Sequence, residues 1–421
     1  MTSPRSTPLR PLDPKERSDD RPPAGRIPRR VPSRVAFPLL ALILFGLFFA
    51  ASAPSPLFLV FQREWHFAPA SLTLAFAVYA LALLATLLIA GSLSDHIGRR
   101  PVLMGALLLQ TVSVVAFLVA DSIGWIIGAR IIQGLATGAA TGALTAAVTE
   151  SAPPERRRLG ALISGVAPLT GLALGALATG FIVQFSGHPT TVVFASLAVF
   201  FALAVPIMFV IPETSTPRPG AWKSLVPRLS IPVRARREFV VSIPVMVASW
   251  ALGGFYLGLA PAIVRNEFGI DSGLVNGLAI ATLFGFGAIA STALGGLAAR
   301  LTTVLGTATL GLGTTIALIS LASDSTLLFF IGTAVAGTGF GAGYTGGIRI
   351  LAPLADAHQR AELFAAVFVV SYVAFGVPAI VAGQLITPLG LHTTALSYGV
   401  LLVAFSVVGL AGHSIAARPR A

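Results

Sequence analysis

A succession of long apolar segments constrains this sequence more than any other feature. Each segment is close to the roughly 20 residues that a helix needs to cross about 30 Å of hydrocarbon. Backbone polar groups in hydrocarbon must be satisfied within the segment, so each one is predicted to be a helix. The predicted spans are residues 36–60, 70–92, 102–120, 123–149, 159–184, 190–211, 239–264, 273–298, 303–322, 326–348, 361–386 and 390–412.

The composition supports a membrane location. Of 421 residues, 55% are hydrophobic and 10% are charged, whereas soluble domains carry about 25% charged residues. The surplus apolar surface must therefore face lipid. The sequence contains no cysteine, which excludes disulfides, thiolate metal sites and a cysteine nucleophile. We predict an all-α integral membrane protein with no metal and no cofactor.

The distribution of basic residues predicts the orientation of the chain. If the chain starts inside the cell and crosses twelve times, 25 of its 28 Lys and Arg residues fall in cytoplasmic segments. This excess follows the positive-inside rule, so both termini are expected in the cytoplasm and the protein in the cell (inner or plasma) membrane. Topology and anionic lipid then explain the net charge of +12, and nucleic-acid binding is not expected.

The sequence also repeats itself, because Gly134-Leu-Ala-Thr-Gly138 has a second-half counterpart in Gly337-Thr-Gly-Phe-Gly341. Transporters are commonly built from such repeats. The predicted organisation is a disordered cytoplasmic tail at 1–34, a six-helix bundle at 35–211, a cytoplasmic linker at 212–238, a second six-helix bundle at 239–412 and a cytoplasmic tail at 413–421.

Several short motifs in the first half resemble those of one transporter family. Gly91-Ser-Leu-Ser-Asp95-His-Ile-Gly98-Arg99-Arg100 resembles the loop motif between the second and third helices of the major facilitator superfamily, and Arg130-Ile-Ile-Gln133-Gly134 is similar to its second motif. Gly165-Val-Ala-Pro168-Leu-Thr-Gly171 only partly resembles the element of proton-coupled drug exporters. The resemblance implies twelve helices in two pseudo-symmetric six-helix bundles, and a bacterial protein similar to drug and metabolite exporters.

The loop after the second span carries the charges expected to control a gate. Asp95 is predicted to bind the positive N-terminal end of the span at 361–386, which begins on the same side of the membrane. Gly98 permits a left-handed backbone, so the arginines after it can fold back toward Glu150. The alternative is that these charges only fix topology. The residues assigned to gating or coupling are Gly91, Asp95, Gly98, Arg99, Arg100, Arg130, Gln133, Glu150 and Arg157.

Arg130 is the one basic residue placed inside a predicted span. A buried arginine in hydrocarbon is costly and tends to be functional, and Gln133, one turn away, can orient it. The alternative is that its side chain reaches the outer interface along its own stem. No acidic residue is predicted at the midplane, so proton coupling would have to use Asp95, Glu150 or Arg130.

The resemblance also implies a central cavity lined by the first, fourth, seventh and tenth spans. A few polar groups among aromatic rings suit a moderately apolar ligand, although each residue can equally serve packing. The cavity candidates are Ser52, Ser55, Gln62, Thr141, Ser249, Trp250, Tyr256, Thr338 and Tyr344. Close helix packing and a bend are expected at Gly165, Pro168, Gly171 and Gly175.

The motifs of other membrane functions are missing from the sequence. It has no HExxH motif and no phosphate-binding GxxxxGK[ST] loop, which argues against a zinc hydrolase and an ATP-driven pump. We predict a monomeric, non-enzymatic secondary transporter in the lipid bilayer that exports a small organic compound by proton antiport. Uptake or facilitated exchange of a sugar or organic acid stays open, as does a channel or receptor.

Overall fold

The structure is a computed structural model, and it describes residues 31–416 except 228 and 357–358. All regular elements of these residues are helical. The first half contains α1 (Ser33–Ser52), α2 (Pro54–Trp65), α3 (Pro69–Ala90), α4 (Leu93–Ile97), α5 (Arg99–Leu118), α6 (Ile123–Ser151), α7 (Arg157–Phe185) and α8 (Pro189–Val210). The remainder contains α9 (Ala221–Ser224), α10 (Val233–Gly258), α11 (Ala260–Asn266), α12 (Gly273–Ala293), α13 (Ala299–Ala322), α14 (Thr326–Leu351) and α15 (Arg360–Ala416).

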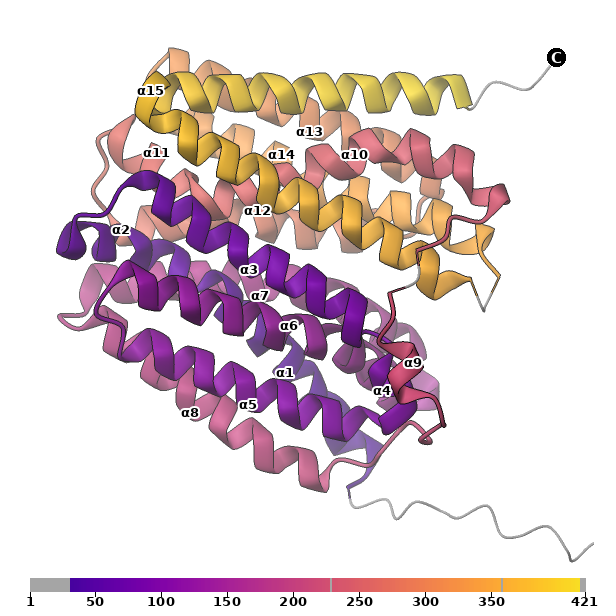
Figure 1. Cartoon of the computed structure of the whole chain (residues 1–421). Coiled ribbons are helices and arrows are strands. Elements are labelled where there is room, and N and C mark those ends of the chain that lie inside the picture. Colours follow the sequence, from indigo (N-terminus) through magenta and orange to yellow (C-terminus); the bar gives the residue numbers. More distant parts are fainter. Residues whose placement is uncertain (1–30, 228, 357–358, 417–421) are drawn as a thin grey trace, which may run out of the picture.

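Eleven helical segments of the described residues are long and apolar enough to cross a membrane. The last of them has 56 residues, which at 1.5 Å per residue is far longer than a bilayer is thick. Gly390, with φ 80° and ψ 161°, interrupts it, and Figure 1 shows α15 turning back as two arms. These two arms correspond to the last two predicted spans. The prediction of an all-α membrane protein is confirmed, while most of the predicted tails lies outside the described residues.

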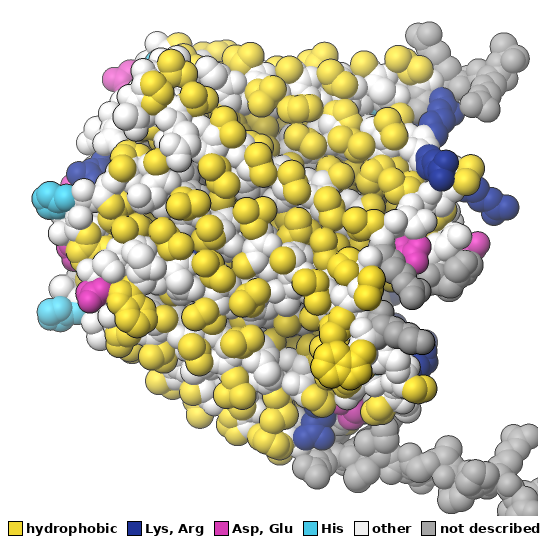
Figure 2. Space-filling model, viewed as in Figure 1, with side chains coloured by type: hydrophobic (Ala, Val, Ile, Leu, Met, Phe, Trp, Pro, Cys, Tyr) yellow, Lys and Arg dark blue, Asp and Glu magenta, His cyan; other side chains and the backbone are white. Residues whose placement is uncertain are grey.

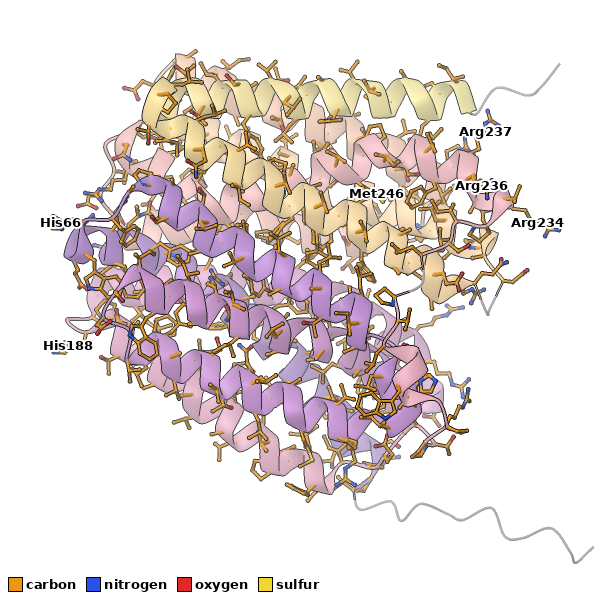
Figure 3. All side chains as sticks on the ribbon, in the orientation of Figure 1. His66, His188, Arg234, Arg236, Arg237 and Met246 are labelled. Carbon is orange, nitrogen blue, oxygen red and sulfur yellow. The ribbon has the colours of Figure 1, made fainter. Side chains whose placement is uncertain are left out.

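The surface of the molecule is that of a membrane protein. Figure 2 shows hydrophobic side chains across the middle of the molecule, with charged and histidine side chains at its two opposite ends. Figure 3 places His66 and His188 at one end, called the α2 end below, and Arg234, Arg236 and Arg237 at the other, called the α4 end. The apolar belt between the ends is what lipid contact requires.

The helices form two bundles that meet along two helix pairs. In the first bundle α1, α3, α5, α6, α7 and α8 pack together, and in the second bundle α10, α12, α13, α14 and both arms of α15 do so. Between the bundles, α7 lies against α12, and α3 lies against the first arm of α15. Figure 1 shows α3 and this arm running side by side.

Glycines allow the backbones of the two bundles to touch near the α2 end. A methyl group on Gly180 would lie 2.5 Å from the carbonyl oxygen of Gly273 and 2.9 Å from the Cα atom of Gly277. One on Gly383 would clash with the side chain of Thr73 across the second pair. Small residues let membrane helices approach this closely, so the bundles are closed against each other at the α2 end.

The predicted packing residues of α7 behave differently from one another. Methyl groups on Gly171 and Gly175 would lie 2.7 and 2.3 Å from carbonyl oxygens of α1, so both are close-packing positions. Pro168 lies inside the helix. Gly165 has no atom within 4 Å of such a group, so the expectation of close packing was wrong there, because that side of α7 faces open space.

Gly180→Ala is expected to lower the melting temperature of the purified protein. The added methyl has no room against α12, and overpacking of this kind costs about 1–3 kcal/mol. Gly165→Ala on the same helix is the matched control, and its melting temperature should stay level or rise because alanine favours a helix. Equal melting temperatures for the two variants would contradict the packing described for α7 and α12.

Candidate functional site

Arg99 is the centre of a charged cluster at the α4 end, called the Arg99 cluster. Its Nη1 atom lies 2.5 Å from the Oδ1 atom of Asp95 and donates to Ser94 Oγ at 2.6 Å, and its Nη2 atom lies 3.1 Å from Glu150 Oε1. The turn before Arg99 is made by Gly98, which has φ 104°. The structure thus brings Asp95, Arg99 and Glu150 together and ties α4, α5 and α6 to one another.

Arg100 takes a different direction from the one expected. It does not reach Glu150, because its Nε and Nη2 atoms donate to the carbonyl oxygens of Met208 and Phe209, at 2.8 and 3.0 Å. These carbonyls belong to the last turn of α8, where the helix has no donors left to offer them. Arg100 therefore fastens the start of α5 to the end of α8.

Glu213 is a member of this site to which no role was assigned from the sequence. Its carboxylate accepts hydrogen bonds from the backbone N–H groups of Arg99, Arg100 and Ser215, at 2.8, 3.0 and 3.1 Å. A carboxylate is stabilised at the positive end of a helix, here the start of α5. A side chain on Gly98 would meet Glu213 at 2.7 Å, so the glycine is required here for space as well as for its φ.

Asp95 does not bind the helix end predicted for it. A cavity of about 540 Å³ separates it from the first turn of α15, and both Asp95 and Glu362 line that cavity. In this conformation the two bundles are therefore apart at the α4 end. The remaining lining residues are Leu87, Leu88, Gly91, Ser92, His96 and Gly142 of the first bundle, Ala361, Phe364, Ala365 and Phe368 of the second, and Gly220 and Val226 between them.

None of the predicted cavity residues lines this cavity, which is formed mainly by α3, α4 and α15, with Gly142 as the residue contributed by α6. Gln62 lies near the α2 end and donates to the carbonyl oxygen of Phe67. Tyr256 lies inside the second bundle, with its hydroxyl 2.6 Å from that of Thr333. Thr141 and Thr338 donate to carbonyls of their own helices. Ser52, Ser55 and Ser249 are buried.

Trp250 and Tyr344 belong to an aromatic cluster that leads to the cavity. Their ring centroids are 5.3 Å apart, and the Trp250 ring lies 4.8 Å from that of Tyr372. Tyr372 is in turn 6.3 Å from Phe368, which lines the cavity. Tyr372 and Phe368 were not predicted, although aromatic residues in the span at 361–386 were a signal that could have found them.

Arg130 is fully buried, which overturns the alternative that it reaches the outer interface. Its Nη1 atom donates to Ala51 O at 2.9 Å and to Gln133 Oε1 at 2.8 Å. The rings of Phe58, Tyr79 and Phe117 lie 5.1, 5.3 and 5.8 Å from its guanidinium carbon. Cation–π contacts of this kind favour a desolvated guanidinium. No carboxylate of the described residues pairs with it.

Pro54 explains why the Arg130 side of α6 binds the backbone of α1. Proline has no N–H group, so the carbonyl oxygen of Ala50, four residues earlier, lacks its usual helical donor. The amide nitrogen of Gln133 supplies that donor at 2.9 Å, and Gln133 also accepts from Arg130. The two side chains thereby satisfy backbone groups at the break between α1 and α2.

Arg157 stands apart from these groups. It begins α7, its side chain is exposed, and it forms no ion pair with the described residues. Glu150 pairs with Arg99, one of the two arginines expected to fold back toward it.

Comparison with known proteins connects the chain to transporters. A model of the Major Facilitator Superfamily matches residues 40–304. Multidrug resistance protein MdtL of Shewanella sp. (strain ANA-3) is 23% identical over 206 residues, which are 48% of this chain and 51% of that protein. The uncharacterized MFS-type transporter YybF of Bacillus subtilis (strain 168) is 28% identical over 132 residues, 31% of this chain and 32% of that protein. The matches thus span about half or less of the curated relatives.

Solved structures share the fold over nearly the whole chain. A POT family transporter in complex with 5-aminolevulinic acid superposes with a TM-score of 0.73 at 12% identity, covering 92% of this chain and 99% of that one. A bacterial homolog of the human lysosomal transporter Spinster, in an inward-facing and occupied conformation, gives 0.71 at 14% identity, covering 90% and 96%. Identities this low establish the fold alone.

Gln133→Leu is expected to lower the melting temperature, because it leaves Ala50 O and one Arg130 donor unsatisfied at a cost of about 1–3 kcal/mol each. Gln110→Leu is the matched control. Gln110 is equally buried, but its amide makes no hydrogen bond with the described residues, so this replacement should be neutral or stabilising. If Gln110→Leu lowered the melting temperature as much as Gln133→Leu, the described hydrogen bonds would not explain the role of Gln133.

Proposed function

We propose that this chain, which belongs to the Major Facilitator Superfamily, is a secondary transporter that exports a small organic compound by alternating access coupled to proton antiport. The observation that carries this proposal is the asymmetry of the two ends: the bundles touch at the α2 end and are separated by the cavity at the α4 end. A carrier in one of its two access states has this arrangement.

Contacts across the α2 end support a closed access route on that side. Arg63 of α2 forms an ion pair with Asp271, just before α12. The hydroxyl of Ser272 donates to Gln184 of α7 at 2.8 Å. Both contacts join the first bundle to the second, and both would break if the bundles rocked apart at this end.

The Arg99 cluster would provide the closing contacts at the α4 end. In the present state Asp95 pairs with Arg99 and faces the cavity across from α15. When the bundles approach at this end, Asp95 comes within reach of the positive N-terminal end of α15. The cluster is therefore assigned the role of an inner gate that exchanges contacts within one bundle for contacts between bundles.

The distribution of charge and the similarity to exporters support the proposed direction of transport. The α4 end carries the exposed arginines of the loops, and the positive-inside rule assigns that end to the cytoplasm. The multidrug resistance proteins to which the chain is similar support export of drug-like compounds. Proton coupling is assigned to the Arg99 cluster and Arg130, because the acidic residues of the described spans lie near their ends.

Transport by the purified protein in liposomes tests this proposal. Vesicles with an acidic lumen should accumulate a transported compound through molecules whose α4 end faces outward, since protons leave as the compound enters. A panel of drugs, sugars and organic acids covers both export and metabolite exchange, and a protonophore should abolish accumulation. Transport of every active compound at a rate independent of the pH gradient would eliminate antiport.

Asp95→Asn should slow this transport about tenfold while the protein still folds, because it removes a charge-assisted contact worth about 1.5–3 kcal/mol. Asp121→Asn, an exposed carboxylate in the turn between α5 and α6, is the matched control and should transport at the normal rate. An unchanged rate for Asp95→Asn would remove Asp95 from the gate.

A reversible cross-link tests alternating access directly. Because the sequence contains no cysteine, the reagent reacts only with the two introduced thiols. With Arg63→Cys and Asp271→Cys in one chain, a short bifunctional thiol reagent should join the bundles at the α2 end and stop transport until it is reduced. Glu267→Cys with His392→Cys is the control, because that pair lies at the same end but within the second bundle. Full transport by the cross-linked Arg63–Asp271 variant would rule out opening at the α2 end.

A further inference from the structure

The segment that connects the two bundles has an unusual combination of charge and exposed apolar side chains. Residues 214–237 contain six Lys or Arg residues and no Asp or Glu. Four large apolar side chains of the same segment are exposed: Trp222 at 86%, Val226 at 63%, Leu229 at 54% and Val233 at 77%. Leaving such side chains in water is unfavourable, so the segment calls for an apolar partner as well as an anionic one.

The position of the segment places it at the membrane surface. α8 ends at Val210 and α10 begins at Val233, and both helices are membrane spans. Both ends of the segment therefore emerge from the bilayer at the α4 end. Figure 3 shows Arg234, Arg236 and Arg237 at this end of the molecule, directed away from the bundle.

Two contacts hold the start of the segment against the first bundle. The carboxylate of Glu213, the residue just before the segment, accepts from the backbone at the start of α5, and the backbone N–H of Arg218 donates to His96 O at 2.8 Å. α9, which carries Trp222, lies beside α4. The first part of the segment is thus held against the first bundle rather than free to extend into solvent.

We propose that residues 214–237 bind anionic phospholipid headgroups, with the exposed apolar side chains inserted at the level of the headgroups. Each basic residue near an anionic leaflet contributes about 1 kcal/mol, and tryptophan favours the membrane interface. A soluble polyanion such as RNA would match the charge but would leave the four apolar side chains in water. The anionic bilayer satisfies both requirements, and it is already in contact with α8 and α10.

This binding has a consequence for the cavity. Gly220 and Val226 belong to the segment and also line the cavity next to His96 and Glu362. Anionic lipid bound by the segment therefore fixes part of the cavity mouth. The lipid-binding proposal does not depend on the identity of the transported compound, or on whether transport is coupled to protons.

An environment-sensitive fluorophore on a single introduced cysteine tests the proposal in the full chain. Leu229→Cys carries the label, and the protein is placed in vesicles of phosphatidylcholine alone or of phosphatidylcholine mixed with phosphatidylglycerol. The anionic vesicles should shift the emission to the blue and raise it about twofold, and high salt should reverse the change by screening. The label on His188→Cys at the α2 end should respond equally in both lipids.

A second variant separates charge from folding. Arg234→Gln, Arg236→Gln and Arg237→Gln together should abolish the response of the Leu229→Cys label while leaving the melting temperature unchanged, since all three side chains are exposed. Identical emission in the two lipids, or an unaltered response in the triple variant, would overturn the proposal. So would an equal blue shift on adding RNA to vesicles of phosphatidylcholine alone.

Discussion

The first bundle depends on the hydrogen bonds that α6 donates to the last carbonyl groups of α1. Pro54 interrupts the helix that starts at Ser33 and leaves a carbonyl without its donor, in a part of the molecule where water is excluded. Gln133 and Arg130 supply the donors, and aromatic rings surround the buried guanidinium. Burying the Arg130 guanidinium without partners would be costly, and these contacts offset that cost. They also hold the bend between α1 and α2 in one conformation.

The two bundles share some, but not all, of the side-chain hydrogen bonds that join their helices. Arg100 fastens the start of α5 to the end of α8, and Arg300 similarly joins the start of α13 to the carbonyl of His413 near the end of α15. The second bundle differs where the first has the Arg99 cluster: there Arg349 donates to the carbonyl of Leu297. The repeat therefore preserves the scaffold, while the ion pairs differ, because in the second bundle Arg300 also pairs with Glu238 of α10 at 2.8 Å.

The sequence was sufficient for the features that depend on local pattern. Span lengths, the glycine turn at Gly98 and the burial cost of Arg130 are each visible within a short stretch of residues. No specific contact was expected of Glu213, because two of its three donors, the backbone N–H groups of Arg99 and Arg100, are more than a hundred residues away. The contact expected of Asp95 depends on which end of the molecule is open, and the side of a helix on which Tyr256 lies depends on packing. No residue pattern encodes either of these.

The contact between α7 and α12 affects how easily the two bundles can separate at the α2 end. At Gly180 and Gly277 backbone meets backbone, so neither residue has a side chain that interlocks across this seam. At these two positions the helices can separate without any rotamer change, unlike the side chains of a close-packed core. The ion pair beside it is exposed, and such pairs contribute about 0–1 kcal/mol. In the proposed transport cycle, this seam would therefore offer little resistance each time the two bundles separate and close again.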